Sequence, residues 1–479
     1  MDSEKRSDLA RLSADARASQ LIAKFHAARE RRESLDAALE LASHFIHGGR
    51  HQQAAQALEI AREYAKGVEA EARLCRLKAN LLYRQGHFSE AAGLLERMAS
   101  HPDIKHYPLA LFGIRMEQAR VCFRQGYLEK ARDFVAEAEI QLSAWQGGQH
   151  QEKIVEAEEE LAWADLYHIK ALLDGASGNH QSALTWYDRE IEILERQEAK
   201  GRLGPVYNNL SGLFKIRGSF YEALEYQQKA HRIAEESQDL LSLAISHNNL
   251  AEIFYDLGDY AAAEENYRRY LALNRRIDNR LGDTFGLAGL GRIARDGEEF
   301  DRAEDYFQQA LTAARQVNSL SRQASILTEL AELYCLQGRC RQAEQTLNQA
   351  VALCLEAQSF NSQRHQLLEA RIRLKAAGLK EGQDSEELDR LEKLISGVLS
   401  QPISQDDEEP VSEPDIVREG YHLLARVQHQ LGKKEQAKNS WRRAWETVEE
   451  VLSRLPQERK EPYLRKPEIR RLKMFQENL

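Results

Sequence analysis

Hydrophobic and small residues in the middle of the chain recur every 40 positions. The clearest column consists of leucines, at Leu210, Leu250, Leu290 and Leu330. Thirteen residues after each leucine comes an alanine, at Ala223, Ala263, Ala303 and Ala343. Self-similarity at a fixed period is the signature of a repeat architecture, in which one supersecondary unit stacks on the next. We therefore expect four copies of one structural unit in this part of the chain.

Each copy contains two helical stripes of apolar residues with a glycine turn between them. In the second copy, Leu250 and Phe254 share one helical face, and Tyr260 and Tyr267 share another. Gly258 lies between the two stripes and marks a tight turn. The unit is thus predicted to be helix, turn, helix. The recurring alanine lets the second helix approach the first closely, where a larger side chain would overpack.

The pattern weakens on either side of these copies, which divides the chain into three predicted regions. Residues 1–145 keep turn glycines and alanines at less regular spacings and are predicted to be degenerate repeats. Residues 155–360 hold the regular array, and an insertion near Trp145 is interpreted as a joint between the two. Residues 361–479 are predicted to contain degenerate repeats, an acidic loop at 402–415 and a basic tail. Such a tail would cap the array, because an end repeat otherwise exposes an apolar face.

Composition narrows the class of protein. Only 9 of the 479 residues are proline, and none lies between Pro205 and Pro402, which suits an unbroken run of helices. The net charge of −10 argues against general nucleic-acid binding, which depends on a basic surface. The five cysteines are odd in number and scattered, as in proteins of reducing compartments. With no secretory signal and no apolar run of membrane-spanning length, we expect a cytoplasmic protein without membrane insertion.

Reactive residues do not converge on a chemical site. His44 and His47 lie three apart on a predicted helix, a spacing that suits a metal, but two surface histidines beside a turn are the simpler interpretation. Cys335 and Cys340 have no second pair at metal-ligand spacing, so packing explains them better. The glycine-rich run 286–291 lacks the lysine and the strand of a phosphate loop and favours close helix packing. We expect no catalytic, cofactor or metal site and no enzymatic activity.

In order along the repeat, leucine, a small residue, an aromatic, a glycine turn, a second aromatic and alanine resemble the tetratricopeptide repeat (TPR). The period here is longer than the usual one of about 34 residues. It is similar to that of the extended repeats of the LGN/Pins, kinesin light chain and bacterial regulatory type. Two Asn-Asn-Leu runs, at 208–210 and 248–250, match that subtype, and Gly282 with Asp283 resembles its turn between repeats. The resemblance, strong from about 165 to 358, implies an all-α fold, a right-handed α-solenoid of stacked antiparallel helix pairs (a TPR superhelix).

The resemblance also implies where a partner would bind. The first helix of each pair lines the concave side of such a superhelix, and in TPR proteins this groove holds a peptide segment. The positions that match ligand-facing ones are Asn208, Asn209, Lys215, Asn248, Asn249, Glu252, Tyr255, Arg292, Arg295, Glu329 and Glu332. An asparagine amide both donates and accepts, so it can pair with a peptide backbone of any sequence.

Two alternatives limit this prediction. Charged residues on a helix surface are often only solvated, and Asn208 or Asn248 can instead make contacts within the array. Cations such as Arg292 and anions such as Glu252 are also mixed in the groove, which leaves the charge of the partner open.

Three functions follow from this sequence. The leading hypothesis is a non-enzymatic scaffold or adaptor that holds a peptide segment of another protein in the groove. The alternative is a signal-responsive regulator similar to bacterial Rap proteins, whose array changes shape on binding a peptide or protein. Against it, residues 40–140 look like ordinary repeats and not a separate effector bundle. The third is self-association through the end repeats, or a basic tail at 455–479 that folds back on the acidic residues 406–415.

Overall fold

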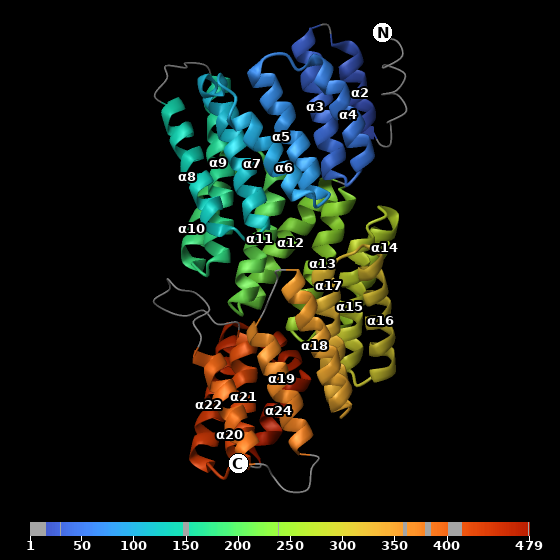
Figure 1. The fold of residues 1–479 in the computed structure, drawn as a ribbon, viewed down its shortest axis with the longest axis vertical. Coiled ribbons are helices and arrows are strands. Elements are labelled where there is room, and N and C mark those ends of the chain that lie inside the picture. The colour runs from blue at the N-terminus through green and yellow to red at the C-terminus, as the bar shows by residue number, and fades with distance from the viewer. Residues whose placement is uncertain are drawn as a thin grey trace. The chain divides into compact units, whose positions relative to one another are not determined.

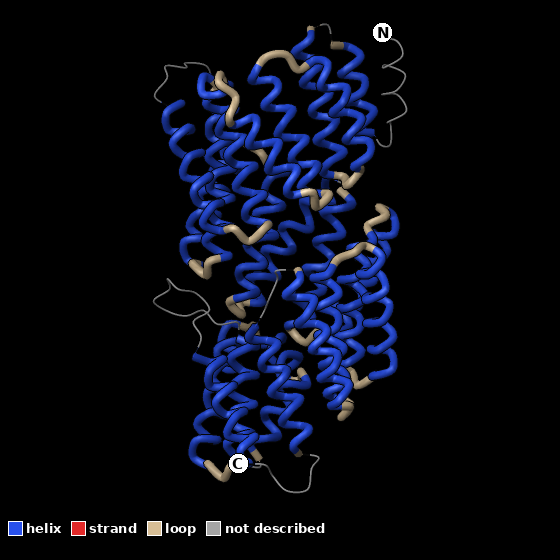
Figure 2. Tube along the Cα trace, viewed as in Figure 1, coloured by secondary structure: helices blue, strands red, loops and turns tan. Residues whose placement is uncertain are grey.

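The computed structural model describes residues 16–28, 30–146, 153–237, 239–357, 362–378, 385–400, 414–477 and 479. Throughout these residues the chain is helix joined by short loops, and no strand occurs in them (Figure 2). Within each of two compact units, neighbouring helices pair antiparallel and successive pairs contact each other, which confirms the predicted all-α solenoid (Figure 1). Of the predicted features, residues 147–152 at the joint and residues 402–413 of the acidic loop lie outside the described residues.

Two compact units make up the chain, and the boundary falls between Val206 and Tyr207. The first unit contains α2 (Ala16–Ala27), α3 (Arg31–His47), α4 (His51–Tyr64), α5 (Val68–Arg84), α6 (Phe88–Ala99), the 3₁₀ turn η1 (Ile104–His106), α7 (Pro108–Arg124), α8 (Leu128–Gln146), α9 (Lys153–Ala176) and α10 (His180–Arg196). Its core lies between neighbouring helices, where Phe45, Leu95 and Leu142 are fully buried.

The second unit begins inside α11 and contains the regular part of the array (Figure 1). Its helices are α11 (Lys200–Ile216), α12 (Phe220–Ser237), α13 (Leu240–Asp256), α14 (Tyr260–Arg276), α15 (Arg280–Asp296), α16 (Phe300–Gln316), α17 (Leu320–Leu336), α18 (Cys340–Glu356), α19 (Ser362–Ala377), α20 (Ser385–Ser400), α21 (Pro414–Gln430), α22 (Lys434–Arg454), α23 (Gln457–Leu464) and α24 (Pro467–Gln476). From α11 to α18 the helices begin at even intervals, and the first helices of successive pairs begin at Lys200, Leu240, Arg280 and Leu320. One helix pair therefore occupies one period of the hydrophobic pattern.

Small residues allow neighbouring helices of the second unit to come close. All four alanines of the repeating column are fully buried. In the glycine-rich run of α15, a Cβ at Gly289 would collide with the ring of Tyr267, and a Cβ at Gly291 with the ring of Phe307. The run therefore packs a helix against aromatic rings, as predicted, and holds no phosphate loop.

Turns within the helix pairs need a backbone conformation that glycine adopts easily. Gly218, Gly258 and Gly338 have φ angles of 72°, 77° and 79°, in the left-handed region where a Cβ is unfavourable. In the third pair Glu298 holds the same position with φ 62°. One repeat therefore contains a strained turn where its neighbours have glycine.

The predicted turn between repeats at Gly282 and Asp283 is wrong. Both residues lie in the first turn of α15, and the chain reverses just before it, where Asp278 has φ 51°. Asn279 caps the helix by accepting a hydrogen bond from the backbone N–H of Gly282 at 3.2 Å. Gly282 is needed for space, because a Cβ there would meet the side-chain amide of Asn274 at about 2.5 Å.

The C-terminal helices pack back onto the start of the second unit. Tyr463, Ile469 and Leu472 are each 1% exposed and share a hydrophobic cluster with Leu224 and Leu250. Polar contacts span the same long separation in sequence. Arg459 pairs with Asp259 at 2.8 Å, and Arg454 donates to the carbonyl oxygen of Arg217 at 2.7 Å. The tail is therefore part of the core of this unit.

Candidate functional site

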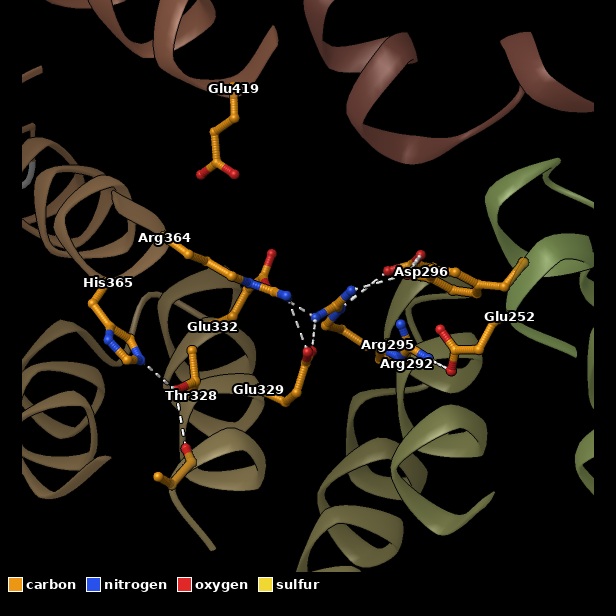
Figure 3. Close-up of polar contacts among 12 residues, drawn as sticks. Glu252, Arg292, Arg295, Asp296, Thr328, Glu329, Glu332, Arg364, His365 and Glu419 are labelled. Carbon is orange, nitrogen blue, oxygen red and sulfur yellow. Dashed lines mark hydrogen bonds and ion pairs between the residues drawn. The ribbon is translucent and has the colours of Figure 1, made fainter. Parts of the chain in front are cut away.

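The predicted ligand-facing residues lie on the first helices of successive pairs, α11, α13, α15 and α17. These helices stack side by side, and the next first helices, α19 and α21, continue the row. Charged side chains along the row form a strip of two ion-paired groups that meet at Tyr255, shown in part in Figure 3. We call it the ion-pair strip and define it as Lys215, Glu252, Arg292, Arg295, Asp296, Glu329, Glu332, Arg364, Arg371 and Glu419.

One end of the strip centres on Glu252. Arg292 and Lys215 are its ion-pair partners, the latter with Nζ 3.4 Å from the carboxylate, and the hydroxyl of Tyr267 donates to it at 2.5 Å. Burial alone would raise the pKa of Glu252. The charges of Arg292 and Lys215, with the Tyr267 hydrogen bond, outweigh burial and lower the pKa to about 2. The group is therefore a carboxylate at any physiological pH.

The middle of the strip centres on Arg295, whose side chain is only 8% exposed. Its guanidinium lies 3.0 Å from Asp296, 2.7 Å from Glu329 and 3.0 Å from Glu332. It also donates to the hydroxyl of Tyr255 at 3.2 Å. Burying a guanidinium is costly unless carboxylates pair with it. Three carboxylates do so here.

At the far end of the strip, arginines of α19 pair with glutamates of the neighbouring first helices. Arg364 pairs with Glu329 at 3.0 Å (Figure 3), and Arg371 bridges Glu332 at 2.7 Å to Glu419. Cations thus lie on α11, α15 and α19, and most anions on α13, α17 and α21. Because the sign alternates from one first helix to the next, every ion pair of the strip except Arg295 with Asp296 joins neighbouring repeats. These charges hold the array together, and they largely neutralise one another.

The asparagines differ from the charged residues. Asn208 accepts a hydrogen bond from Gln227 at 2.7 Å and has the Asn249 amide nitrogen 3.5 Å away. Asn209 also has a partner within the chain. The side-chain oxygen of Asn248 is buried and accepts no hydrogen bond from any described residue. Such an acceptor is costly to bury unpaired, and Asn248 differs from Asn208 and Asn209 in that its side-chain oxygen has no donor among the described residues.

The sequence named six of the ten residues of the ion-pair strip and missed Asp296, Arg364, Arg371 and Glu419. Arg371 was missed because counting 40 residues on from Glu332 leads to Ile372, one residue past Arg371. Arg364 escaped for a similar reason, since it follows Glu329 by only 35 positions. Glu419 follows segment 401–413, which the structure does not describe. Its position relative to the 40-residue repeat therefore cannot be counted. A search for charge alternation within one or two residues of the period would have found Arg371.

The C-terminal tail contacts Tyr255, one of the predicted ligand-facing residues. Lys466, 2% exposed, donates to the carbonyl oxygen of Asp256 at 3.1 Å and lies 5.6 Å from the ring centre of Tyr255. Burial opposes its charge, but Glu468, Asp415 and Asp256 hold the pKa of Lys466 above its usual value. The described part of the tail thus contacts α13. A contact with residues 406–413, which the sequence suggested, lies outside the described residues.

Among the described residues, no group of three or more histidine, cysteine, aspartate or glutamate side chains is placed to hold a metal ion. The side chain of His47, one of the two histidines considered above, is outside the description. No described helix is both long enough and apolar enough to cross a membrane.

Comparison with known proteins agrees with this architecture. Two solved structures share the fold: a Rap protein complexed with Competence and Sporulation Factor (TM-score 0.54, 14% identity, 81% of this chain and 100% of that one) and aspartyl phosphate phosphatase F from Bacillus subtilis (TM-score 0.51, 12% identity, 80% and 94%). No curated protein matches the sequence. The model of the MalT-like TPR region matches residues 168–443, more than half of the chain. The chain therefore belongs to the family of MalT-like TPR regions.

Proposed function

We propose that this protein is a non-enzymatic scaffold that binds a peptide segment of a partner protein along the first helices of its second unit. The regular repeats would be of the extended TPR kind, as the even spacing of helix starts from α11 to α18 supports. The observation that carries the proposal is the unpaired, buried oxygen of Asn248, which lies in the row of predicted ligand-facing residues.

The ion-pair strip changes how such a segment would be held. Glu252, Arg292, Arg295, Glu329 and Glu332 already pair with one another, so a ligand gains little from them without breaking buried ion pairs. The side-chain oxygen of Asn248 is left to accept a hydrogen bond from the peptide backbone. Each such bond contributes about 1 kcal/mol, so the affinity must come from several repeats together.

Capture of partners from a native extract, read by mass spectrometry, tests this assignment. Asn248→Ala combined with Asn249→Ala should abolish capture of proteins that the wild type retains. Asn348→Ala is the matched control, because Asn348 is exposed on the second helix α18. Arg292→Ala is unsuitable, since it would leave Glu252 short of its main counter-charge. If the double variant is folded by circular dichroism and captures the same proteins, the asparagines do not form the site.

A regulator that changes shape is the second candidate, and the packing of the tail favours it. Contacts between residues 200 or more apart, such as Arg459 with Asp259, tie the two ends of the second unit together. The similar Rap protein is complexed with Competence and Sporulation Factor. A ligand that binds within the tied unit would compact or open it. Small-angle scattering that shows the same radius of gyration with and without ligand would exclude this candidate.

The cellular compartment of the protein and the class of its partner are also proposals. We place it in the cytoplasm with a protein or peptide partner, without nucleic acid or membrane insertion. All five cysteines are free, and four of them are buried, which supports a reducing compartment. Self-association stays possible, and the mass measured in solution by light scattering over a range of concentrations tests it.

A further inference from the structure

A line of hydrogen bonds runs through the interior of the second unit, from α12 to one of the predicted ligand-facing residues. Its centre is Gln227, which has no exposed surface. The amide nitrogen of Gln227 donates to Oδ1 of Asn208 at 2.7 Å and to Oγ of Ser246 at 3.1 Å. Nδ1 of His231 lies 3.1 Å from the same hydroxyl. The line therefore joins His231 on α12 to Asn208 on α11.

The two hydrogens of the Gln227 amide fix the direction of these bonds. One goes to Asn208 and one to Ser246, so the hydroxyl of Ser246 accepts and has its own hydrogen left to donate. Nδ1 of His231 is placed to accept that hydrogen. Nε2 of His231 lies 3.4 Å from the carboxylate of Glu235, where a nitrogen that carries hydrogen is favoured. Neutral His231 therefore has its hydrogen on Nε2 and a bare Nδ1.

The groups around His231 allow it to take up a charge. Glu235 on the same helix supplies a negative charge, and the His231 side chain is 18% exposed, so a proton from water can reach it. The ring of His247 on α13 lies edge-on at 4.8 Å between ring centres, and burial lowers the pKa of His247, which keeps that ring neutral near pH 7. From α14, Asn266 pairs with His247 at 2.8 Å, and Arg269 is ion-paired within its own helix. Charged His231 thus faces one anion and a neutral ring.

A second hydrogen on the His231 ring reverses every bond in the line. Nδ1–H then donates to the hydroxyl of Ser246, whose own hydrogen needs another acceptor. The side-chain oxygen of Gln227 can serve, because it is buried and has no donor among the described residues. Once the Gln227 amide turns over to bring this oxygen to Ser246, its nitrogen no longer faces Asn208. The Asn208 amide then turns over as well and donates its N–H to the same oxygen.

Turning the Gln227 amide over costs little pairing. With His231 neutral the oxygen of Gln227 is unpaired, and with His231 charged the nitrogen is unpaired, so one end lacks a partner in either state. The long contact between Asn208 and the amide nitrogen of Asn249, at 3.5 Å, is given up. The proton on His231 therefore decides between the two states.

We propose that this line is a proton-controlled switch that reverses the amide of Asn208, which presents its N–H groups to a ligand when His231 is neutral and its oxygen when His231 is charged. Gln227 is then a positioning residue. Above the midpoint of the switch Asn208 pairs with a peptide carbonyl, and below it with a peptide N–H. This consequence for a ligand rests on the proposed function, whereas the switch itself involves only side chains of this protein.

Nuclear magnetic resonance of the full chain, with nitrogen-15 in histidine, asparagine and glutamine, tests the switch without a ligand. Histidine changes its charge between about pH 5 and 8. At the upper limit His231 should carry hydrogen on Nε2 and not on Nδ1. As the pH falls through this range, the side-chain amide protons of Asn208 should shift with the same midpoint as the His231 ring, while those of exposed Asn348 should not. Hydrogen on Nδ1 at the upper limit, a ring that does not titrate, or an Asn208 amide that does not shift overturns the proposal.

Two variants distinguish a switch from a purely structural contact. Ser246→Ala removes the hydroxyl in the middle of the line, so His231 should still titrate while the Asn208 amide stops responding. His231→Gln removes the titrating ring, so the response of Asn208 should be lost. Ser325→Ala, at an exposed serine of α17, is the matched control and should titrate as the wild type does. An Asn208 response that persists in folded Ser246→Ala overturns the proposal. None of these spectra depends on partner capture, so the switch and the proposed function can fail separately.

Discussion

Gly258 and Gly338 share one backbone conformation but have different surroundings, and this pair measures what the tail contributes. Their φ angles are 77° and 79°, so an alanine is strained to the same extent at either position. A Cβ at Gly338 meets nothing within 4 Å. A Cβ at Gly258 would lie 2.5 Å from the carbonyl oxygen of Pro462 and 3.2 Å from Cγ of Lys466, both in the tail.

The expected losses in the free energy of unfolding follow from these contacts. A left-handed conformation costs an alanine about 1–2 kcal/mol, which is the whole cost expected for Gly338→Ala. Gly258→Ala carries the same cost and adds about 1–3 kcal/mol of overpacking, because the clash is with backbone and cannot be relieved by a rotamer change. The difference between the two variants is limited by the free energy of docking the tail. Above that limit the tail detaches and exposes Tyr463 and Leu472.

Urea unfolding and hydrogen exchange together measure this. Gly258→Ala should lower the free energy of unfolding by about 1–3 kcal/mol more than Gly338→Ala. It should also raise exchange in residues 457–476, whereas Gly338→Ala should leave that segment protected. If the two variants cost the same and the tail stays equally protected in both, the contact between Gly258 and Pro462 does not hold the tail in place.

Three further predictions concern the second unit. Glu298→Gly should stabilise the protein by about 1 kcal/mol, since Glu298 has φ 62° where the neighbouring repeats have glycine; an unchanged or lower melting temperature would contradict this. Arg292→Ala should cost about 3 kcal/mol in urea unfolding because Glu252 stays buried without its main counter-charge, and adding Glu252→Gln should recover part of that loss; additive costs would show that the pair is not coupled. The pKa of Glu252 is lowered to about 2 from 4.5, so its contribution, about 3 kcal/mol, is complete above pH 4.5 and lost as the pH falls toward 2. Urea unfolding between pH 7 and pH 3 should therefore show a shallower loss of stability in Glu252→Gln than in the wild type.

The repeat itself could be predicted from the sequence because it depends on local periodicity. Buried side chains on a helix recur every three or four residues, and the turn between two helices needs a residue that tolerates positive φ. Leu250, Gly258 and Ala263 carry this information within a few residues of one another. Evenly spaced helix starts, and an alanine column that is fully buried, follow from such short-range constraints.

The pattern failed where one residue type serves two purposes. Gly282 looked like a turn residue, but it stands in α15 because the Asn274 amide leaves no room for a Cβ. Gly258 looked like a turn residue and is one, yet it also makes room for Pro462 of the tail. A turn with positive φ and a lack of space for a Cβ both select glycine, so only the neighbours in space distinguish the two requirements.

The pairing of the predicted ligand-facing residues depended on contacts that no local pattern contains. The sequence identified charged positions on successive first helices, but the structure decided that Arg295 pairs with Glu329 and Glu332, so that these charges bind the repeats to each other. The hydrogen bonds that join His231 to Asn208 are likewise visible only once α11, α12 and α13 are packed. The physical reason is range: the period of a helix is set by bonds between near neighbours, whereas the pairing of a buried charge is set by whatever the fold brings within about 4 Å of it.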